Sequence, residues 1–215
     1  MKLKIHRGTK EIGGSCVEVW TKTTRILVDC GMPLVAQDGH QFEIDKYKNL
    51  NIAELIKEGI LPDVAGLYGD GSVIDGIILS HAHLDHYGLF DFLNPEIKIY
   101  LGQATHKIIE LNSLFTPQSI TIANPVYFEK EKTFQIGDIS ITPYWADHSA
   151  FDSYSFLIEA DGKKIFYSGD FRGHGRKSKV FEWFTHHAPQ NVDYLLLEGT
   201  SLGRENKPSK SEIEI

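Results

Sequence analysis

A short segment rich in histidine is the part of this sequence best suited to chemistry. It follows the apolar run Ile77–Leu79 directly and reads His81-Ala82-His83-Leu84-Asp85-His86. Side chains two positions apart in an extended chain point the same way, so His81 and His83 can bind one ion together. Asp85 and His86 stand where the next helix is expected to begin, and they can face a second ion. The alternative is an exposed loop that happens to contain histidine, but burying so many ionisable groups without a metal would be costly.

Two later positions repeat this arrangement of an apolar strand followed by a ligand-type side chain. The run Ile139–Trp145 leads to His148, and the run Ile165–Ser168 leads to Asp170. Strand ends in open α/β sheets converge on one rim, where binding sites collect. We therefore expect both side chains to join the histidine cluster. Imidazole nitrogens combined with carboxylate oxygens suit zinc, with iron and manganese as alternatives.

Apolar periodicity predicts the elements that must position these side chains. Strands are expected at Leu3–Arg7, Cys16–Trp20, Arg25–Asp29, Ile77–Leu79, Ile97–Leu101, Ile139–Trp145, Tyr154–Glu159, Lys164–Ser168 and Tyr194–Leu197. Helices are expected at Asn51–Glu58, Asp85–Leu93, Gln103–Leu114 and Lys179–His187. Many strands with interspersed helices indicate a layered α/β protein.

The composition is that of one globular domain with a substantial core. The chain has 215 residues, of which 41% are hydrophobic and 24% are charged. No apolar run approaches the roughly 18 residues that span a bilayer, and the N-terminus lacks the apolar stretch of a signal peptide. Cys16 and Cys30 are expected to be buried thiols and not a disulfide. The cytoplasm is the expected location.

The charge balance limits the ways in which this protein can bind nucleic acid. A formal net charge of −7 argues against a binding module that depends on a basic surface. It does not exclude a nuclease, because bound metal ions add positive charge locally. The residues after Asp170 include four cations that could contact a phosphate chain, with a solvated loop as the equal alternative: Arg172, Arg176, Lys177 and Lys179.

These residues together resemble the metallo-β-lactamase superfamily. The spacing His-x-His-x-Asp-His, followed by His148 and Asp170, is similar to the ligand pattern of that superfamily. The resemblance extends to Glu11-Ile12-Gly13-Gly14-Ser15, Asp29-Cys30-Gly31 and Ser168-Gly169-Asp170. The motif Leu197-Glu198-Gly199-Thr200 resembles the first motif specific to the β-CASP branch, which contains ribonuclease J and the cleavage-and-polyadenylation endonuclease. The match covers most of residues 1–205.

The resemblance implies an αββα sandwich, in which two sheets carry helices on their outer faces. The superfamily takes a further histidine from its C-terminal half, whereas no histidine follows Glu198 here. We therefore expect residues 1–215 to be an N-terminal portion without the last strands, the β-CASP insert and the C-terminal half; a complete half-sized protein is the alternative. Open sheet edges would then favour self-association or pairing with the missing half.

The resemblance also implies a role for each residue of the cluster. It places one zinc on His81, His83 and His148, a second on Asp85 and His86, and Asp170 between the two. A hydroxide held between the metals would be the nucleophile, since zinc lowers the pKa of bound water to about 7. Two catalytic roles follow. Asp85 would orient this hydroxide or accept its proton, and Glu198 would support an acid histidine.

The leading functional hypothesis is hydrolysis of RNA phosphodiester bonds by two zinc ions. A second hypothesis is a hydrolase of the same superfamily that cleaves a small ester, lactone, thioester or phosphoester. A third is a non-catalytic scaffold that retains metal or partner binding. Glu198 and the basic stretch favour the first, net acidity leaves room for the second, and the intact ligand pattern weighs against the third.

Overall fold

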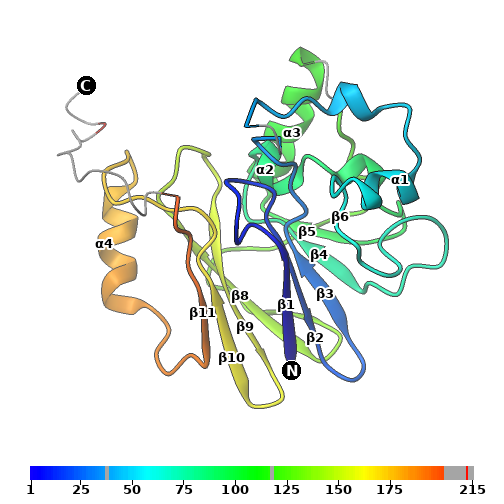
Figure 1. The fold of residues 1–215 in the computed structure, drawn as a ribbon. Coiled ribbons are helices and arrows are strands. Elements are labelled where there is room, and N and C mark those ends of the chain that lie inside the picture. The colour runs from blue at the N-terminus through cyan, green and yellow to red at the C-terminus, as the bar shows by residue number, and fades with distance from the viewer. Residues whose placement is uncertain (37–38, 117–118, 201–211, 213–215) are drawn as a thin grey trace.

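Two β-sheets packed face to face form the centre of the molecule. The computed structural model describes residues 1–36, 39–116, 119–200 and 212. Helices cover both outer faces of the sheet pair, three on one side and one on the other (Figure 1). This αββα arrangement confirms the fold class that the sequence predicts. Within the described residues, no helix is long and apolar enough to cross a membrane.

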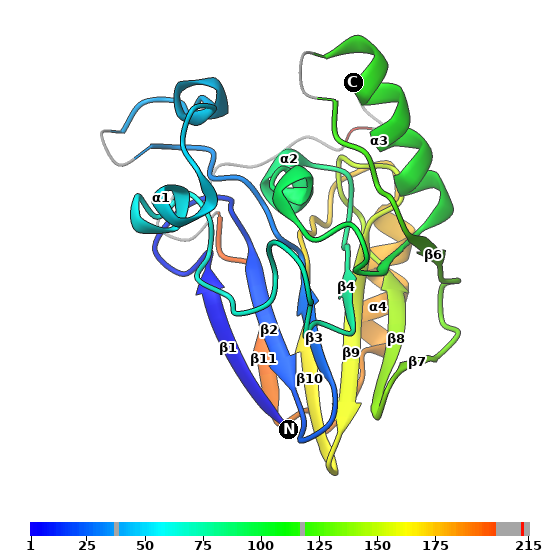
Figure 2. The ribbon, with the colours of Figure 1, turned by 90° about the vertical axis from the view of Figure 1, so that its right-hand side faces the viewer.

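The first sheet combines an antiparallel half with a parallel half. Its order is β1 (Lys2–Arg7), β2 (Cys16–Trp20), β3 (Arg25–Val28), β4 (Gly76–Ile78), β5 (Ile99–Leu101) and β6 (Pro125–Tyr127). The first three strands pair antiparallel, and β3 to β6 pair parallel. The parallel strands are joined by crossovers that carry α1 (Ile52–Lys57), α2 (Leu84–Tyr87) and α3 (Gln103–Phe115). These helices lie on the side that faces the viewer in Figure 2.

The second sheet is largely antiparallel. Its order is β11 (Tyr194–Leu196), β10 (Lys163–Tyr167), β9 (Tyr154–Ala160), β8 (Ile139–Trp145) and β7 (Phe134–Ile136), with β10 and β11 parallel. Helix α4 (Ser178–His187) packs on its outer face. The ring of Phe184 on α4 lies 5.4 Å from that of Phe166 and 5.9 Å from that of Tyr144, measured between centroids.

Alternating side chains of β3 supply two separate cores. Ile26 and Val28 pack between the two sheets, whereas Leu27 packs against the helices on the other face. All three side chains are fully buried. This two-residue period follows from the pleat of a strand, and it explains why three consecutive residues of the strand are apolar.

Most predicted elements are present within one or two residues of their expected bounds. The helix expected over Asp85–Leu93 is wrong: α2 ends at Tyr87, and a separate 3-10 turn covers Phe90–Phe92. The chain leaves the helix at Gly88, where a Cβ atom would lie 2.4 Å from the carbonyl oxygen of Leu84. The sequence analysis also missed β6 and β7, because each has only three residues and lies at a sheet edge.

Candidate metal centre

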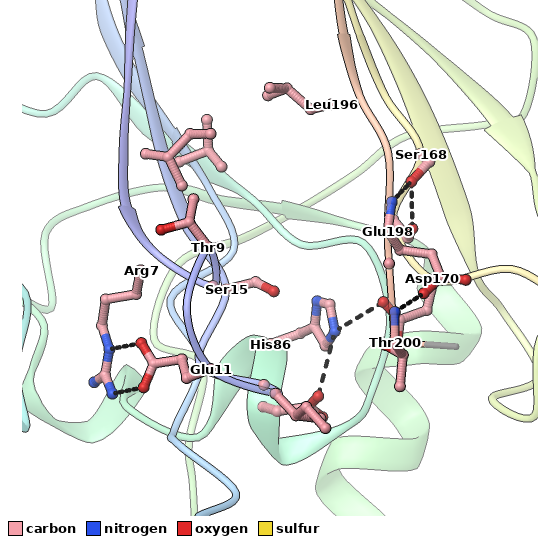
Figure 3. A pocket seen from close by; sticks show the side chains of 18 of the residues that line it. Arg7, Thr9, Glu11, Ser15, His86, Ser168, Asp170, Leu196, Glu198 and Thr200 are labelled. Atoms are coloured by element: carbon pink, nitrogen blue, oxygen red, sulfur yellow. Dashed lines mark hydrogen bonds and ion pairs between the residues drawn. The ribbon is translucent and has the colours of Figure 1, made fainter. Parts of the chain in front are cut away.

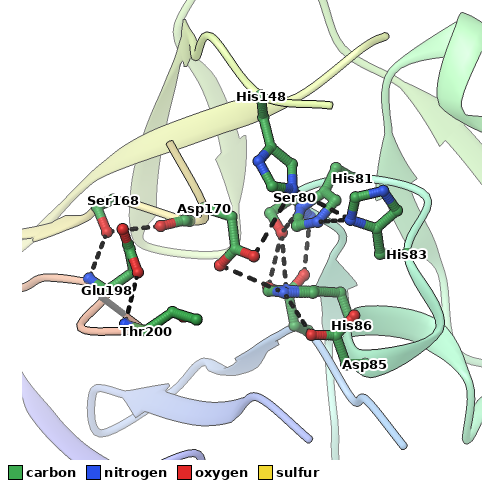
Figure 4. A network of polar contacts seen from close by, with 12 residues as sticks. Ser80, His81, His83, Asp85, His86, His148, Ser168, Asp170, Glu198 and Thr200 are labelled. Atoms are coloured by element: carbon green, nitrogen blue, oxygen red, sulfur yellow. Dashed lines mark hydrogen bonds and ion pairs between the residues drawn. The ribbon is translucent and has the colours of Figure 1, made fainter. Parts of the chain in front are cut away.

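The ends of five strands bring the predicted site residues to one rim of the sandwich. Each of β3, β4, β8, β10 and β11 is followed by a polar side chain of the cluster. Strands β3 and β4 are parallel, and so are β10 and β11; β8 points the same way as β10 because both pair antiparallel with β9. Their carboxyl ends therefore meet at the same rim. Figure 4 shows the six predicted ligand residues gathered there: His81, His83, Asp85, His86, His148 and Asp170.

Three histidine nitrogens converge on one point. The Nδ1 atom of His83 lies 3.1 Å from Nε2 of His81 and 3.1 Å from Nε2 of His148. One ring nitrogen has either one proton or one lone pair, so it cannot satisfy both neighbours by hydrogen bonding. Zinc–nitrogen bonds of 2.0–2.1 Å in a tetrahedral site place the ligand nitrogens about 3.3 Å apart. The donor set and spacing of His81, His83 and His148 therefore fit a divalent metal ion.

A second group of ligand atoms adjoins the first. The Nε2 atom of His86 lies 3.5 Å from Oδ1 of Asp170 and 3.7 Å from Oδ2 of Asp85. The other oxygen of Asp170, Oδ2, lies 3.7 Å from Nε2 of His148. The two oxygens of Asp170 thus face different histidines. His81, His86 and Asp170 form a second group that could hold a metal ion.

Asp29 organises this side of the site, and the sequence analysis did not single it out as a functional residue. It is fully buried, with a φ of 59° in the left-handed region that disfavours residues other than glycine. Its Oδ2 atom accepts hydrogen bonds from Nδ1 of His86 at 2.7 Å and from the hydroxyls of Ser80 and Tyr167 at 2.8 and 2.7 Å. Its Oδ1 atom accepts from the Ser80 N–H. A buried carboxylate placed directly after a strand is the signal that could have identified it.

Burial and neighbouring charges give the four histidines opposite protonation preferences. Burial lowers the pKa of His81 well below its usual range, lowers that of His83, and lowers that of His148 to about 4. Burial also opposes charge on His86, but the carboxylates of Asp29 and Asp170 outweigh it and raise the pKa of that ring to about 10. The first three rings thus keep free lone pairs at neutral pH, which metal binding requires. The surroundings of His86, by contrast, favour the protonated, positively charged form of its ring.

Glycines allow two neighbouring segments to pack against the start of α2. A Cβ atom on Gly31 would lie 1.6 Å from the carbonyl oxygen of Asp85, and one on Gly13 would lie 2.8 Å from the Asp85 Cβ. The same carbonyl accepts the N–H of Ser15 at 3.0 Å. This close approach fixes the backbone of the segment that carries Asp85 and His86, and it gives a physical reason for both glycine-containing motifs.

An open cavity of about 1180 Å³ adjoins the second group of ligand atoms. Residues 7–15 line one side and residues 195–200 line the other, with His86 between them (Figure 3). Glu198 borders this cavity, and its backbone N–H donates to the Ser168 hydroxyl at 3.0 Å. The Glu198 carboxylate accepts the N–H of Thr200 at 2.9 Å. Glu198 therefore lies on the rim of the cavity.

The basic stretch after Asp170 is only partly available to a ligand. Arg172 forms a two-point ion pair with Glu212, at 2.7 and 2.8 Å, and Lys177 donates to three backbone carbonyls. Arg176 and Lys179 have exposed side chains. The interpretation of all four cations as surface contacts for phosphate is therefore wrong for Arg172 and Lys177.

Comparisons with known proteins agree with this geometry. A family model described as Beta-lactamase superfamily domain matches residues 24–213. An RNase J-like protein of Methanocaldococcus jannaschii is 30% identical over 78% of this chain and 36% of its own length. Transcription termination factor FttA of Methanothermobacter thermautotrophicus is 26% identical over 99% of this chain and 34% of its own length. Ribonuclease J of Helicobacter pylori is 25% identical over 77% of this chain and 22% of its own length. The chain thus spans about a third or less of the length of these curated relatives.

Solved structures show the same fold. A protein of unknown function from Enterococcus faecalis superposes with a TM-score of 0.77 at 26% identity, over 96% of this chain and 52% of that one. The metallo-beta-lactamase fold protein YhfI from Bacillus subtilis superposes with a TM-score of 0.53 at 16% identity, over 90% of this chain and 69% of that one. The family match, the fold and the clustered ligand atoms lead to one assignment: the chain belongs to the beta-lactamase superfamily, and its similarity to ribonuclease J-like proteins confirms the resemblance in its sequence.

Proposed function

We propose that this chain carries the dinuclear metal centre of a hydrolase that cleaves phosphodiester bonds in RNA. The observation that carries the proposal is the convergence of three neutral imidazoles on one point, beside a second group that shares Asp170. The Nδ1 atom of His83 lies 3.1 Å from Nε2 of both His81 and His148 and cannot satisfy both by hydrogen bonding, whereas the three nitrogens together suit a divalent cation. The names of the similar ribonuclease J-like proteins support RNA as the substrate.

Each ligand residue then has a defined place. One ion would be held by His81, His83 and His148, and the other by His86 and Asp85. Asp170 would contribute to both, which is supported by its two oxygens lying 3.5 Å from His86 and 3.7 Å from His148. Zinc fits this nitrogen and oxygen set first, with iron or manganese as alternatives. Two such ions would supply the positive charge that activates water and stabilises the oxygens of a phosphate undergoing displacement.

The carboxyl groups of the chain would perform the proton and positioning steps. Burial raises the pKa of Asp85, with Asp170 adding to the effect and His86 opposing it. The Asp85 carboxylate lies beside His86 and Asp170, where it would hold the second ion and accept a proton from the attacking water. Glu198 borders the same cavity and accepts the Thr200 N–H, which supports the proposal that it would assist a proton donor.

We also propose the cytoplasm as the place of this activity. Both cysteines, Cys16 and Cys30, are buried free thiols, as the sequence analysis expected. Free thiols are typical of reducing compartments. RNA in the same compartment would be the partner of the site.

Metal content and cleavage together test this function. Purified protein should contain between one and two transition-metal ions per chain by elemental mass spectrometry, and the full-length protein should cleave single-stranded RNA only when loaded with metal. Asp85→Ala should nearly abolish cleavage, because it removes both a ligand and the proton acceptor. Asp70→Ala is the matched control, since Asp70 is exposed and lies outside the site. Metal-free protein after growth with ample metal would rule out the centre.

The substrate class needs its own comparison. Metal-loaded full-length protein should be assayed on RNA, on bis-p-nitrophenyl phosphate and on a generic lactone. Cleavage of RNA supports the proposal. Rapid turnover of the lactone with no cleavage of RNA would instead identify a small-molecule hydrolase, and metal binding without turnover of any substrate would identify a scaffold.

A further inference from the structure

Two loops that carry proposed ligands are joined by a buried carboxylate. The loop between β8 and β9 carries His148, and the loop between β10 and α4 carries Asp170. Asp147, in the first loop, is almost fully buried. Its side chain accepts the backbone N–H of Gly175 at 2.9 Å and that of Lys177 at 3.3 Å, both in the second loop.

Lys177 makes the reciprocal contact from the second loop to the first. Its Nζ atom donates to the carbonyl oxygens of Ala146, Ala150 and Phe151 at 3.1, 3.2 and 2.7 Å. An ammonium group has three protons, so these carbonyls use its full donor capacity. Each loop therefore hydrogen bonds to the backbone of the other through one charged side chain. We call this pair of contacts the Asp147–Lys177 clasp.

Gly175 leaves the space that the contacts of the Asp147–Lys177 clasp require. A Cβ atom at this position would lie 2.3 Å from Oδ1 of Asp147 and 2.5 Å from Nε of Arg172. Any side chain would push the carboxylate away from the backbone that it holds. The clasp thus depends on glycine, a buried aspartate and a lysine within two short loops.

His148 is the proposed ligand that most needs such support. The ring of His81 is oriented by the Ser80 hydroxyl at 3.0 Å, and the ring of His86 by Asp29 at 2.7 Å. Among the described residues, the ring nitrogens of His148 hydrogen bond only with those of His83, itself a proposed ligand. A metal ligand that also hydrogen bonds to a residue outside the ligand set is fixed in orientation by that bond. The direction of His148 must therefore come from the backbone of its loop, which the clasp holds.

We propose that Asp147 and Lys177 are positioning residues that hold His148 and Asp170 in the relative placement needed to bind metal. This inference rests on the proposed metal centre, although neither residue is one of its ligands. The distance of 3.7 Å between His148 Nε2 and Asp170 Oδ2 is set by the two loops together. Loosening either loop therefore separates the first group of ligand atoms from the shared carboxylate.

Cobalt(II) and zinc(II) binding to the purified protein test the inference. Lys177→Met should weaken the affinity for the first ion by about 10- to 100-fold, which is typical of losing an outer-shell partner. It should also change the visible absorption bands of bound cobalt, which report ligand geometry. Lys179→Met is the matched control, because it removes the same charge from an exposed position two residues away. It should bind both metals as the unaltered protein does.

A purely structural role gives a different result. Lys177→Met would then lower the melting temperature of the metal-free protein while leaving the metal affinity and the cobalt spectrum of the folded fraction unchanged, and this outcome would overturn the inference. If Lys177→Met does not fold, Asp147→Asn decides, because it keeps the size and one acceptor of the side chain. Weaker metal binding by that variant supports the clasp, and unaltered binding overturns it. Failure of the unaltered protein to bind metal would be recognised separately, since it refutes the metal centre itself.

Discussion

Asp29 is a buried carboxylate that controls the orientation and basicity of His86, although it is not itself a proposed metal ligand. It fixes the Nδ1 side of His86 at 2.7 Å and leaves Nε2 facing Asp170 and Asp85. It also ties the end of β3 to the end of β4 through Ser80 and to the end of β10 through Tyr167. Orientation and basicity of His86 therefore both depend on a residue outside the proposed ligand set.

Asp29→Asn should lower the affinity of the second metal by about 10- to 100-fold, because the amide is uncharged and binds His86 less strongly. The three-histidine group is not bonded to Asp29 directly and should retain its ion. Calorimetric titration with zinc, which resolves the two steps, measures both affinities. Equal weakening of both sites, or of neither, would contradict this role.

The ion pairs of Glu18 predict that the fold becomes less stable as the pH becomes acidic. Its buried carboxylate pairs with Nε2 of His6 at 2.7 Å and with the Arg25 guanidinium. Burial alone would raise the pKa of Glu18, but the hydrogen bonds from Arg25 and His6 outweigh it and lower that pKa. A carboxyl whose folded pKa is depressed stabilises the fold above its unfolded pKa of about 4.3 and loses that contribution as pH falls through the folded value.

Glu18→Gln should therefore reduce the free energy of unfolding by about 1–3 kcal/mol at pH 7. The difference from the unaltered protein should shrink as the pH falls below about 4, where the unaltered carboxyl also becomes neutral. Urea unfolding at pH 7, 5, 4 and 3 measures it. A difference that stays constant over this range would show that the ion pairs do not set the pKa.

At the scale of elements, α3 depends on a cap from another part of the chain. Gly102 precedes the helix and has no side chain to cap it. The Oδ2 atom of Asp152 instead accepts the N–H of Thr105 in the first turn at 2.9 Å, and Oδ1 accepts the Tyr154 hydroxyl at 2.8 Å. A Cβ atom on Gly102 would lie 2.2 Å from that Oδ2. The loop that carries His148 is thereby attached to the helix layer.

Asp152→Ala should cost about 1–2 kcal/mol of stability, the usual value for a lost helix cap. Asp152→Asn keeps an oxygen acceptor and should cost less. Urea unfolding at neutral pH ranks the two variants. The opposite ranking, or no loss in either, would show that Asp152 is not the cap of α3.

Elements could be predicted where their sequence signal is local and strong. Strand β8 has seven residues with an alternating buried pattern, and its predicted bounds match the observed ones. The ligand cluster could be predicted because residue type and spacing carry it. By contrast, a Cβ atom at Gly88 would lie 2.7 Å from the Cβ of Met32, a close approach between distant residues that local spacing does not indicate. Asp147 and Asp152 could not be identified as functional because their partners come together only in the folded chain.

At the scale of the whole molecule, the charged side chains around the proposed metal centre determine how strongly RNA is attracted to it. Two of the four cations after Asp170 are used internally, so Arg176 and Lys179 remain as exposed cations of that stretch. The formal net charge of −7 leaves little general attraction for a polyanion. Binding that depends on the metal centre, with a small contribution from these two side chains, fits this distribution.

Replacing Arg176 and Lys179 by glutamine should weaken RNA binding and reduce its salt dependence. The slope of log affinity against log salt should fall by about 0.7 for each phosphate that the protein no longer neutralises. Lys2→Gln with Lys22→Gln is the matched control, because these exposed lysines lie at the end of the first sheet opposite the rim. Fluorescence anisotropy at several salt concentrations measures the slopes. An unchanged slope would remove this stretch from the RNA-binding surface.

The sheet edges give a last prediction, which concerns association between molecules. Strand β11 ends the second sheet, and its free side is unpaired among the described residues. Three side chains there are more than half exposed, Tyr194 at 55%, Leu195 at 57% and Leu197 at 60%. An exposed apolar edge strand readily pairs with another chain.

We therefore expect the purified protein to self-associate as its concentration rises, with sedimentation velocity as the measurement. Leu195→Lys with Leu197→Lys should shift it toward monomer, because charge on an edge strand disfavours pairing. Leu111→Lys with Leu114→Lys changes two exposed leucines on α3, which is a helix and not an edge strand, and is the matched control. Metal content should be the same in all variants, since none of these side chains belongs to the metal centre. A monomer at every concentration in the unaltered protein would show that the β11 edge is not an association surface.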